Sequence, residues 1–258
     1  MSAPAPPFNG QQLPEVRQVL AGVSDYLQGA TTSDGRLVCP EHRLDHTGRS
    51  ARSIVIDCAL HAATGDDRYY ERALSRALTT DARLAPDPEH GAWVFHPGRL
   101  EPNNMSTSVI DGGDCVDALA TFLMQFADRV DADLRARLEA TIARHCDTYL
   151  ANAAVTKEVT NQRLWGAMGL ASAYRLTGNA AWEDAVMRSL EVSFGEQNPD
   201  GSFPYHPAAA EHGLPAGAGG ASVYYQSRHL AFAHHARTLC DDPDAFAAEF
   251  ERGLDFLL

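Results

Sequence analysis

The stretch NQRLWGAMGLASAYRLTGNAAWEDAV, residues 161–186, decides the fold. Its first half places apolar side chains every three to four residues, the spacing that puts them on one face of a helix. The segment TGNA, residues 177–180, then stops one helix and starts another. Gly178 can adopt the left-handed conformation that ends a helix, and the Asn179 side chain can accept from the first amides of the next. This stretch therefore predicts two antiparallel helices joined by a short turn.

The same apolar period recurs along the whole chain. It predicts helices at 12–29, 50–64, 67–80, 112–129, 131–150, 162–177, 180–195, 222–239 and 244–258. Short connections at 64–67, 129–132, 177–180 and 240–243 alternate with long ones near 30–50, 81–111, 151–161 and 196–221. Helices joined by a short turn are antiparallel neighbours, so we expect all short turns at one end of the assembly and all long connections at the other.

The long connections contain a second repeat. The segments DGRLVCP (34–40), HGAWVFHP (90–97) and NPDGSFPYHP (198–207) each combine a polar residue, a glycine, an apolar or aromatic residue and a closing proline. Their glycines Gly35, Gly91 and Gly201 are 56 and 110 residues apart, so one copy is missing near residue 146. We expect each segment to turn at its glycine, with NPDGSF laying Phe203 and Tyr205 over a central mouth.

A helical hairpin that repeats at this interval cannot bury its apolar face alone, so hairpins must stack or close into a ring. We predict an all-α fold, an incomplete α/α toroid of about four to five helical hairpins with its long loops on one rim. The toroid would form a single domain over residues 11–258, after a disordered, proline-rich segment at 1–10.

Composition excludes several classes of partner. The 258 residues carry a net charge of −13, and Lys157 is the only lysine. Without a basic run we expect no nucleic-acid partner, although arginines in a cleft can still bind an anionic substrate. No apolar run approaches the length of a membrane span, and no secretory signal follows Met1, so we expect no membrane partner and a cytoplasmic protein. Five cysteines without a CxxC spacing favour reduced, packed thiols.

Short motifs carry a resemblance to known families. FGEQNPDGSF (194–203), with Gln197, Asp200 and Gly201, resembles the Gln-Trp repeat of the squalene-cyclase and prenyltransferase superfamily. It also resembles the Q-x-x-DGS loops of α/α-toroid polysaccharide lyases and unsaturated-glucuronyl hydrolases, and residues 161–186 look like an inner and outer helix pair of those toroids. The resemblance implies a six-hairpin-like toroid and a carbohydrate-active enzyme. The Asp-x-Asp-Asp motif of a squalene-type cyclase is absent, which weakens a terpene-cyclase interpretation.

The densest group of chemical side chains spans residues 205–229. Tyr225 and Arg228 lie three apart near the start of a predicted helix and therefore share a face. Abstracting the proton α to a uronate carboxylate needs a base, together with donors that hold the carboxylate. The resemblance to toroid lyases implies such an Asn/His/Tyr/Arg set. We assign base and acid to Tyr225 and His212 (His206 being the alternative acid), and the carboxylate clamp to Arg228 and Asn104 (or Asn103). Substrate-binding roles go to Trp93, Phe203, Tyr205, His206 and Tyr224.

A purely structural role can also explain these aromatic residues. Tyr224 and Tyr225 can simply pack against the Gly/Ala-rich loop that precedes them while the histidines stay solvated. Trp93 and Phe203 can stack on a sugar, but an aromatic residue two positions after a turn glycine also serves as a packing anchor. Both interpretations remain open from the sequence.

Three aspartates form a second candidate site. Asp111, Asp114 and Asp117 recur every third residue where the sequence predicts a helix start, and the helix dipole alone can explain carboxylates there. The sharper hypothesis is that Asp111 or Asp114 is a general acid or base, as the resemblance to glucuronyl hydrolases implies. A magnesium-binding cluster is a third possibility.

The remaining motifs give weaker indications. A zinc site from His42 and His46 with an acid is conceivable, but the loop lacks the framing of known zinc motifs, so we assign no metal. GLPAGAGG (213–220) lacks the strand and lysine of a phosphate-binding loop, and we expect no cofactor. The sequence thus favours acid/base chemistry of the lyase type on an acidic, uronate-containing oligosaccharide. The alternatives are a glycoside hydrolase using Asp111 or Asp114, an isoprenoid cyclase, and a non-catalytic binding or scaffold module.

Overall fold

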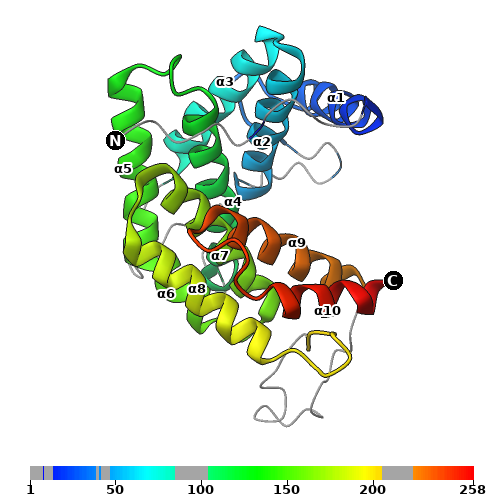
Figure 1. The fold of residues 1–258 in the computed structure, drawn as a ribbon. Coiled ribbons are helices and arrows are strands. Elements are labelled where there is room, and N and C mark those ends of the chain that lie inside the picture. The colour runs from blue at the N-terminus through cyan, green and yellow to red at the C-terminus, as the bar shows by residue number, and fades with distance from the viewer. Residues whose placement is uncertain (1–7, 9–13, 39–40, 42–46, 85–103, 205–222) are drawn as a thin grey trace. The chain divides into compact units, whose positions relative to one another are not determined.

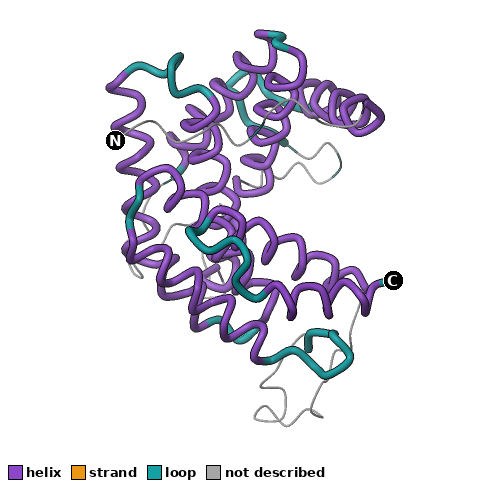
Figure 2. The backbone as a smooth tube through the Cα atoms, in the orientation of Figure 1, coloured by secondary structure: helices purple, strands orange, loops and turns teal. Residues whose placement is uncertain are grey.

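The computed structural model describes residues 8, 14–38, 41, 47–84, 104–204 and 223–258, the side chains of 49 and 104–108 excepted. These residues are mostly helical, and no strand occurs among them (Figure 2). The all-α prediction is confirmed. The described chain divides into two compact units, Met1–His145 and Cys146–Leu258. Each unit is described by itself, and the closed arrangement of a single toroid over 11–258 stays a prediction.

The described residues of the first unit form five helices (Figure 1). They are α1 (Pro14–Gly29), α2 (Thr47–Thr64), α3 (Asp67–Arg83), α4 (Asn104–Gln125) and α5 (Ala132–His145). Helix α4 is buried around its circumference from Val109 to Met124 because α2, α3 and α5 all pack on it. Its sequence is apolar on nearly every face, as a central helix requires.

The second unit begins with a π-helical turn, η1 (Cys146–Leu150), which is followed by α6 (Ala151–Thr156). The longer helices are α7 (Thr160–Thr177), α8 (Ala180–Gly195), α9 (Val223–Leu239) and α10 (Ala247–Leu257). Helix α7 is the central helix here, in contact with α6, α8 and α9. The helices α2, α4, α7 and α9, which start at 47, 104, 160 and 223, recur at nearly even intervals, in keeping with the hairpin repeat.

The predicted glycine stops and glycine turns are confirmed where they lie within the described residues. Gly65 and Gly178 both have the left-handed conformation, with φ of 68° and 74°. Asp66 accepts from the amide of Arg68 at 3.0 Å, and Asn179 accepts from that of Ala181 at 3.1 Å. The turn glycines Gly35 and Gly201 are also left-handed, with φ of 82° and 89°, whereas Gly91 lies outside the described residues.

Two predicted boundaries are wrong. The expected long connection at 151–161 is largely helix α6, because residues 146–160 contain neither glycine nor proline to stop the chain. This is also where the glycine repeat lacks a copy. Helix α4 begins at Asn104 rather than at residue 112. Gly112 therefore lies inside the helix. The His145 ring occupies the space that a side chain at position 112 would need, since an added Cβ would lie 2.0 Å from His145 Nε2.

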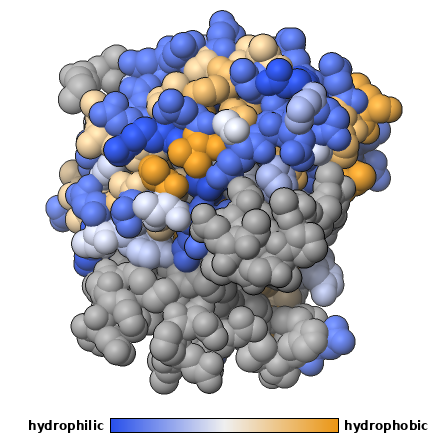
Figure 3. Space-filling model, turned by 90° about the horizontal axis from the view of Figure 1, so that it is seen from below, coloured by the Kyte–Doolittle hydropathy of each residue, from blue (hydrophilic) through white to orange (hydrophobic). Residues whose placement is uncertain are grey.

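Packing and surface agree with the composition. Cys58, Cys115, Cys146 and Cys240 are buried free thiols, as predicted, and burial raises the pKa of Cys58 and Cys115 well above the ordinary value. On the face drawn in Figure 3 the described residues are mostly hydrophilic, with small apolar spots between them. None of the described helices is both long and apolar enough to span a membrane.

Candidate functional site

The first turns of α9 carry a layered group of aromatic rings and one cation. The Arg228 guanidinium lies over two rings, with its carbon 4.5 Å from the centroid of Tyr224 and 5.3 Å from that of Trp165 on α7. Tyr225 meets Tyr224 edge to face, with centroids 5.3 Å apart. Trp165 is in turn anchored on Phe232, at 4.7 Å. We call Trp165, Tyr224, Tyr225 and Arg228 the α9 face.

The contacts that Arg228 makes within the α9 face do not use its hydrogen-bond donors. The guanidinium carbon lies over the rings of Tyr224 and Trp165, and a cation in this position is attracted by the faces of the rings. Among the described residues none accepts a hydrogen bond from Arg228, and no carboxylate pairs with it. Tyr224 is 56% exposed, so an aromatic surface beside the arginine is open to solvent. A planar carboxylate is the group that the edge of a guanidinium binds best.

Of the residues predicted to form the lyase site, the structure brings together Tyr224, Tyr225 and Arg228. Asp111 and Asp114 belong to the first unit and are described there. Asn104 is the first residue of α4, and its side chain is outside the description. Seven further candidates lie outside the described residues, namely His42, His46, Trp93, Asn103, Tyr205, His206 and His212.

The aspartates of α4 are not at a helix start. Asp111 and Asp114 are the eighth and eleventh residues of α4, so the helix dipole does not explain them. They are 2% and 1% exposed. Asp114 Oδ1 lies 3.4 Å from Nε of Arg52 on α2, and Arg52 also pairs with Asp117. Asp111 is pressed against the start of α2, where a Cβ on Gly48 would lie 2.6 Å from its Oδ1. These carboxylates tie α2 to α4.

The turn in NPDGSF is a junction of three helices. Gly201 turns the chain, with the Asn198 amide donating to the Ser202 carbonyl at 2.8 Å. The Gly201 carbonyl accepts from Gln197 of the preceding loop at 3.0 Å and from Gln226 of α9 at 2.9 Å. Gln197 also donates to the Glu249 carbonyl of α10 at 3.0 Å. The loop thereby fastens the end of α8 to α9 and α10.

Phe203 is a packing anchor and not an exposed stacking wall. It is 2% exposed, and its ring lies 5.6 Å from that of Phe194 and 5.3 Å from that of His229. The substrate-binding role expected for Phe203 is therefore wrong in this structure. A ring that is closed in on both sides by α8 and α9 has no face left for a sugar.

A buried polar cluster lies beside Phe203. Arg163 of α7 pairs with Glu196 and donates to Ser193 Oγ at 3.0 Å. His229 is 1% exposed, and neither of its ring nitrogens has a hydrogen-bond partner among the described residues. Burial lowers the pKa of His229 to about 4, and the positive charge of Arg163 adds to the shift. The imidazole is therefore neutral at pH 7.

Two members of this region were missed by sequence reasoning. Trp165 underlies Arg228 although 63 residues separate them, and a tryptophan within an apolar helical stripe gave no signal beyond packing. His229 is the last residue of the predicted group at 205–229, but no role was assigned to it. Its burial follows from the helical period, since it lies three residues after the buried Gln226.

Comparison with known proteins adds no family to this picture. No protein-family model matches the chain, and no curated protein matches its sequence. The class that the observations define is an all-α protein built from helical hairpins, with an aromatic and cationic face at the start of α9.

Proposed function

We propose that the protein is a carbohydrate-active enzyme that binds an acidic sugar at the α9 face and cleaves it by β-elimination. The observation that carries the proposal is the position of the Arg228 guanidinium over the rings of Tyr224 and Trp165, with no acceptor for its N–H groups among the described residues. An arginine that is fixed in this way is ready to bind a carboxylate with little further loss of rotamer freedom.

Each group of the α9 face matches one part of a uronate. The edge of Arg228 offers two parallel N–H donors, which a sugar carboxylate accepts in a bidentate pair. The exposed ring of Tyr224 offers an apolar face for the C–H face of the pyranose ring. Binding of the carboxylate neutralises part of its charge, and this acidifies the proton on the carbon that bears it.

In the proposed reaction Tyr225 is the base that takes the proton from C5 of the uronate. The electron pair of the C–H bond forms the C4–C5 double bond as the C4–O bond breaks, and the departing oxygen takes up a proton from His212 or from water. Arg228, assisted by Asn104, would stabilise the negative charge that develops on the carboxylate. The oligosaccharide is split without consumption of water.

Hydrolysis by Asp111 or Asp114 has less support. Both carboxylates are buried, and Asp114 pairs with Arg52, whereas a general acid or base must reach the glycosidic oxygen or a water molecule. The experiment must separate the lyase from the hydrolase and from the non-catalytic binding module. An isoprenoid cyclase would neither bind nor cleave the oligosaccharide.

The test is incubation of the full chain with uronate-containing oligosaccharides. The lyase gives an unsaturated product that absorbs in the ultraviolet, and the signal disappears in a Tyr225→Phe variant with an unchanged circular dichroism spectrum. New reducing ends without ultraviolet absorbance would identify a hydrolase. Binding of the oligosaccharide without any product would identify a binding module, and neither binding nor turnover would overturn the proposal.

A further inference from the structure

A cavity separate from the α9 face lies in the first unit. It measures about 300 Å³, part of which is open solvent, and it is bounded by α2, α3 and the turn that follows α1. Three arginines line it, Arg36, Arg76 and Arg83, together with five hydroxyl side chains. Among the described residues that line it there is no carboxylate. The cavity is therefore lined by a local concentration of hydrogen-bond donors.

The fold delivers each arginine from a defined position. Arg76 and Arg83 lie seven residues apart on α3 and so share one face of that helix, with Thr80 between them. Arg36 comes from the DGR turn, in which the Thr32 amide donates to the Arg36 carbonyl at 2.8 Å. The absence of a side chain at Gly35 allows this turn to lie close against α3, since an added Cβ would lie 2.3 Å from Thr79 Oγ1. The first glycine segment therefore closes one wall of the cavity.

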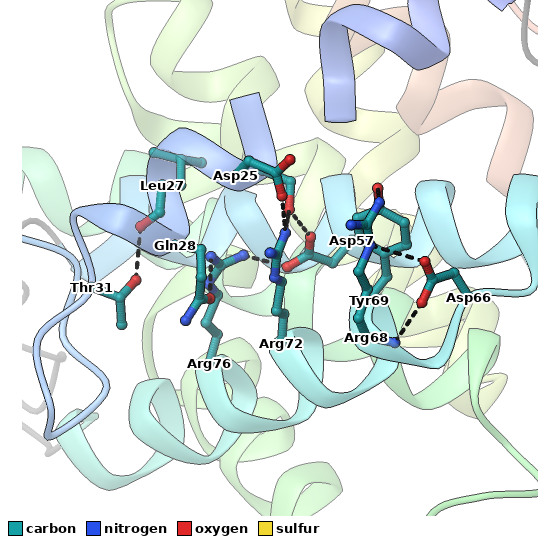
Figure 4. A network of polar contacts seen from close by, with 11 residues as sticks. Asp25, Leu27, Gln28, Thr31, Asp57, Asp66, Arg68, Tyr69, Arg72 and Arg76 are labelled. Atoms are coloured by element: carbon teal, nitrogen blue, oxygen red, sulfur yellow. Dashed lines mark hydrogen bonds and ion pairs between the residues drawn. The ribbon is translucent and has the colours of Figure 1, made fainter. Parts of the chain in front are cut away.

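Arg76 keeps a donor for a ligand. It is 5% exposed, pairs with Asp57 through Nη1, and donates from Nη2 to Gln28 Oε1 at 3.3 Å. Figure 4 shows its side chain rising from α3 toward Gln28 and Asp57. Its Nε is buried and has no acceptor among the described residues. A buried guanidinium N–H without a partner is costly, and a bound anion would satisfy it.

The carboxylates near the cavity leave further donors on the arginines. Asp57 pairs with Arg76, and the exposed Asp34 pairs with Arg36 at 2.7 Å. Each carboxylate engages one edge of a guanidinium that carries five N–H groups.

The start of α2 adds a third direction of approach. Thr47 is the first residue of this 18-residue helix, and Thr47 and Ser50 both line the cavity. The first amides of a helix lack acceptors within it and carry the positive end of its dipole. The first turn of α2 contains no acidic residue of its own, and the Asp111 side chain of α4 lies against it at Gly48.

We infer that this cavity binds a tetrahedral oxyanion, a phosphate or sulfate group, between Arg36, Arg83, the Nε of Arg76 and the first turn of α2. Donors that converge from a turn and two helices suit a tetrahedral group better than a planar carboxylate. The inference does not depend on the proposed function, so a negative lyase assay leaves it standing.

The test is binding of sodium phosphate and sodium sulfate to the full chain, followed by calorimetry and by thermal unfolding at constant ionic strength set with sodium chloride. Either anion is expected to raise the melting temperature where chloride does not. An Arg36→Gln, Arg83→Gln double variant should bind at least tenfold more weakly. The matched control is Arg68→Gln, an exposed arginine of α3 that pairs with Asp66 and does not line the cavity, and it should bind as the unmodified protein does.

A hexose phosphate and a sulfated hexose identify the source of the group. Tighter binding of either than of the inorganic ion means that the cavity recognises the charged group of a larger ligand, and equal binding means that it recognises the free ion. Equal stabilisation by chloride, or unchanged affinity in a double variant whose circular dichroism spectrum is intact, would overturn the inference.

Discussion

The Nε2 of Gln226 lies 2.9 Å from the carbonyl oxygen of Gly201, and the Oε1 of the same side chain accepts from the Phe203 amide at 2.9 Å. One buried amide therefore holds both sides of the DGSF turn against α9. The glutamine and the glycine are 25 residues apart, and their contact makes the turn a fixed part of the second unit.

Replacement of Gly201 by alanine should destabilise the second unit strongly. The residue has φ of 89°, and an added Cβ would lie 2.0 Å from the carbonyl oxygen of Arg252, so backbone must move. We expect a loss of roughly 3 kcal/mol in the free energy of unfolding, measured by urea denaturation. The control Gly178→Ala has a similar φ of 74° but no atom within 4 Å of its Cβ, and should cost about 1 kcal/mol. Equal costs would show that the close approach to Arg252 is unimportant.

The buried His229 should make stability depend on pH. Its pKa in the folded state is about 4, below the ordinary 6.5, so the unfolded chain binds more protons between these values. Stability contributed by the neutral ring is present above pH 6.5 and is lost as the pH falls toward 4, by at most about 3 kcal/mol. Arg163 and its partner Glu196 are the charged groups nearby.

The His229 contribution is isolated by difference. Burial raises the pKa of Glu196 and of Asp57, so these carboxyls contribute the opposite slope in the same pH range. The free energies of unfolding of the parent and of a His229→Gln variant are compared from pH 7 to pH 4. Their difference should shrink as the pH falls, and a constant difference would show that the ring is not held neutral.

The buried ion pair between Asp57 and Arg76 should contribute far more to stability than the exposed ion pair between Asp25 and Arg72. Asp57 is fully buried and also accepts from Ser24 Oγ at 2.6 Å. The variant Asp57→Asn leaves the buried charge of Arg76 without its partner, and we expect a loss of about 3–5 kcal/mol in urea unfolding. Asp25→Asn removes an exposed partner of Arg72 and should lower the free energy of unfolding far less, because water screens an exposed ion pair. Similar costs for the two variants would contradict this assignment.

Helix stops could be predicted from a few neighbouring residues of the sequence, whereas contacts between residues far apart in the chain could not. The stops at Gly65 and Gly178 could be predicted because a left-handed glycine followed by Asp or Asn is recognisable within four residues. The helix start was wrongly predicted at Gly112, because the ring that leaves no space for a side chain there belongs to His145, which lies 33 residues away. Nor does any local pattern reveal that Arg76 meets Asp57 and lines a cavity with Arg36.

Arg228→Lys should weaken recognition of the acidic sugar while leaving the fold intact. Lysine keeps the charge but offers neither a planar group to lie over the rings of Tyr224 and Trp165 nor a bidentate edge. We expect at least a tenfold rise in KM for a uronate oligosaccharide, and the same loss in calorimetric binding of the sugar where turnover is too slow to follow.

The control for this variant is Arg237→Lys on the same helix. Arg237 also stacks on a ring, with its guanidinium carbon 4.7 Å from the centroid of Phe250, but its Nη1 donates to the Pro243 carbonyl at 2.8 Å. Its donors are thus partly used within the protein, and it lies nine residues beyond Arg228. Sugar affinity should therefore be unchanged in Arg237→Lys. If Arg228→Lys binds the sugar as well as Arg237→Lys does, Arg228 is a structural cation and the acidic sugar binds elsewhere.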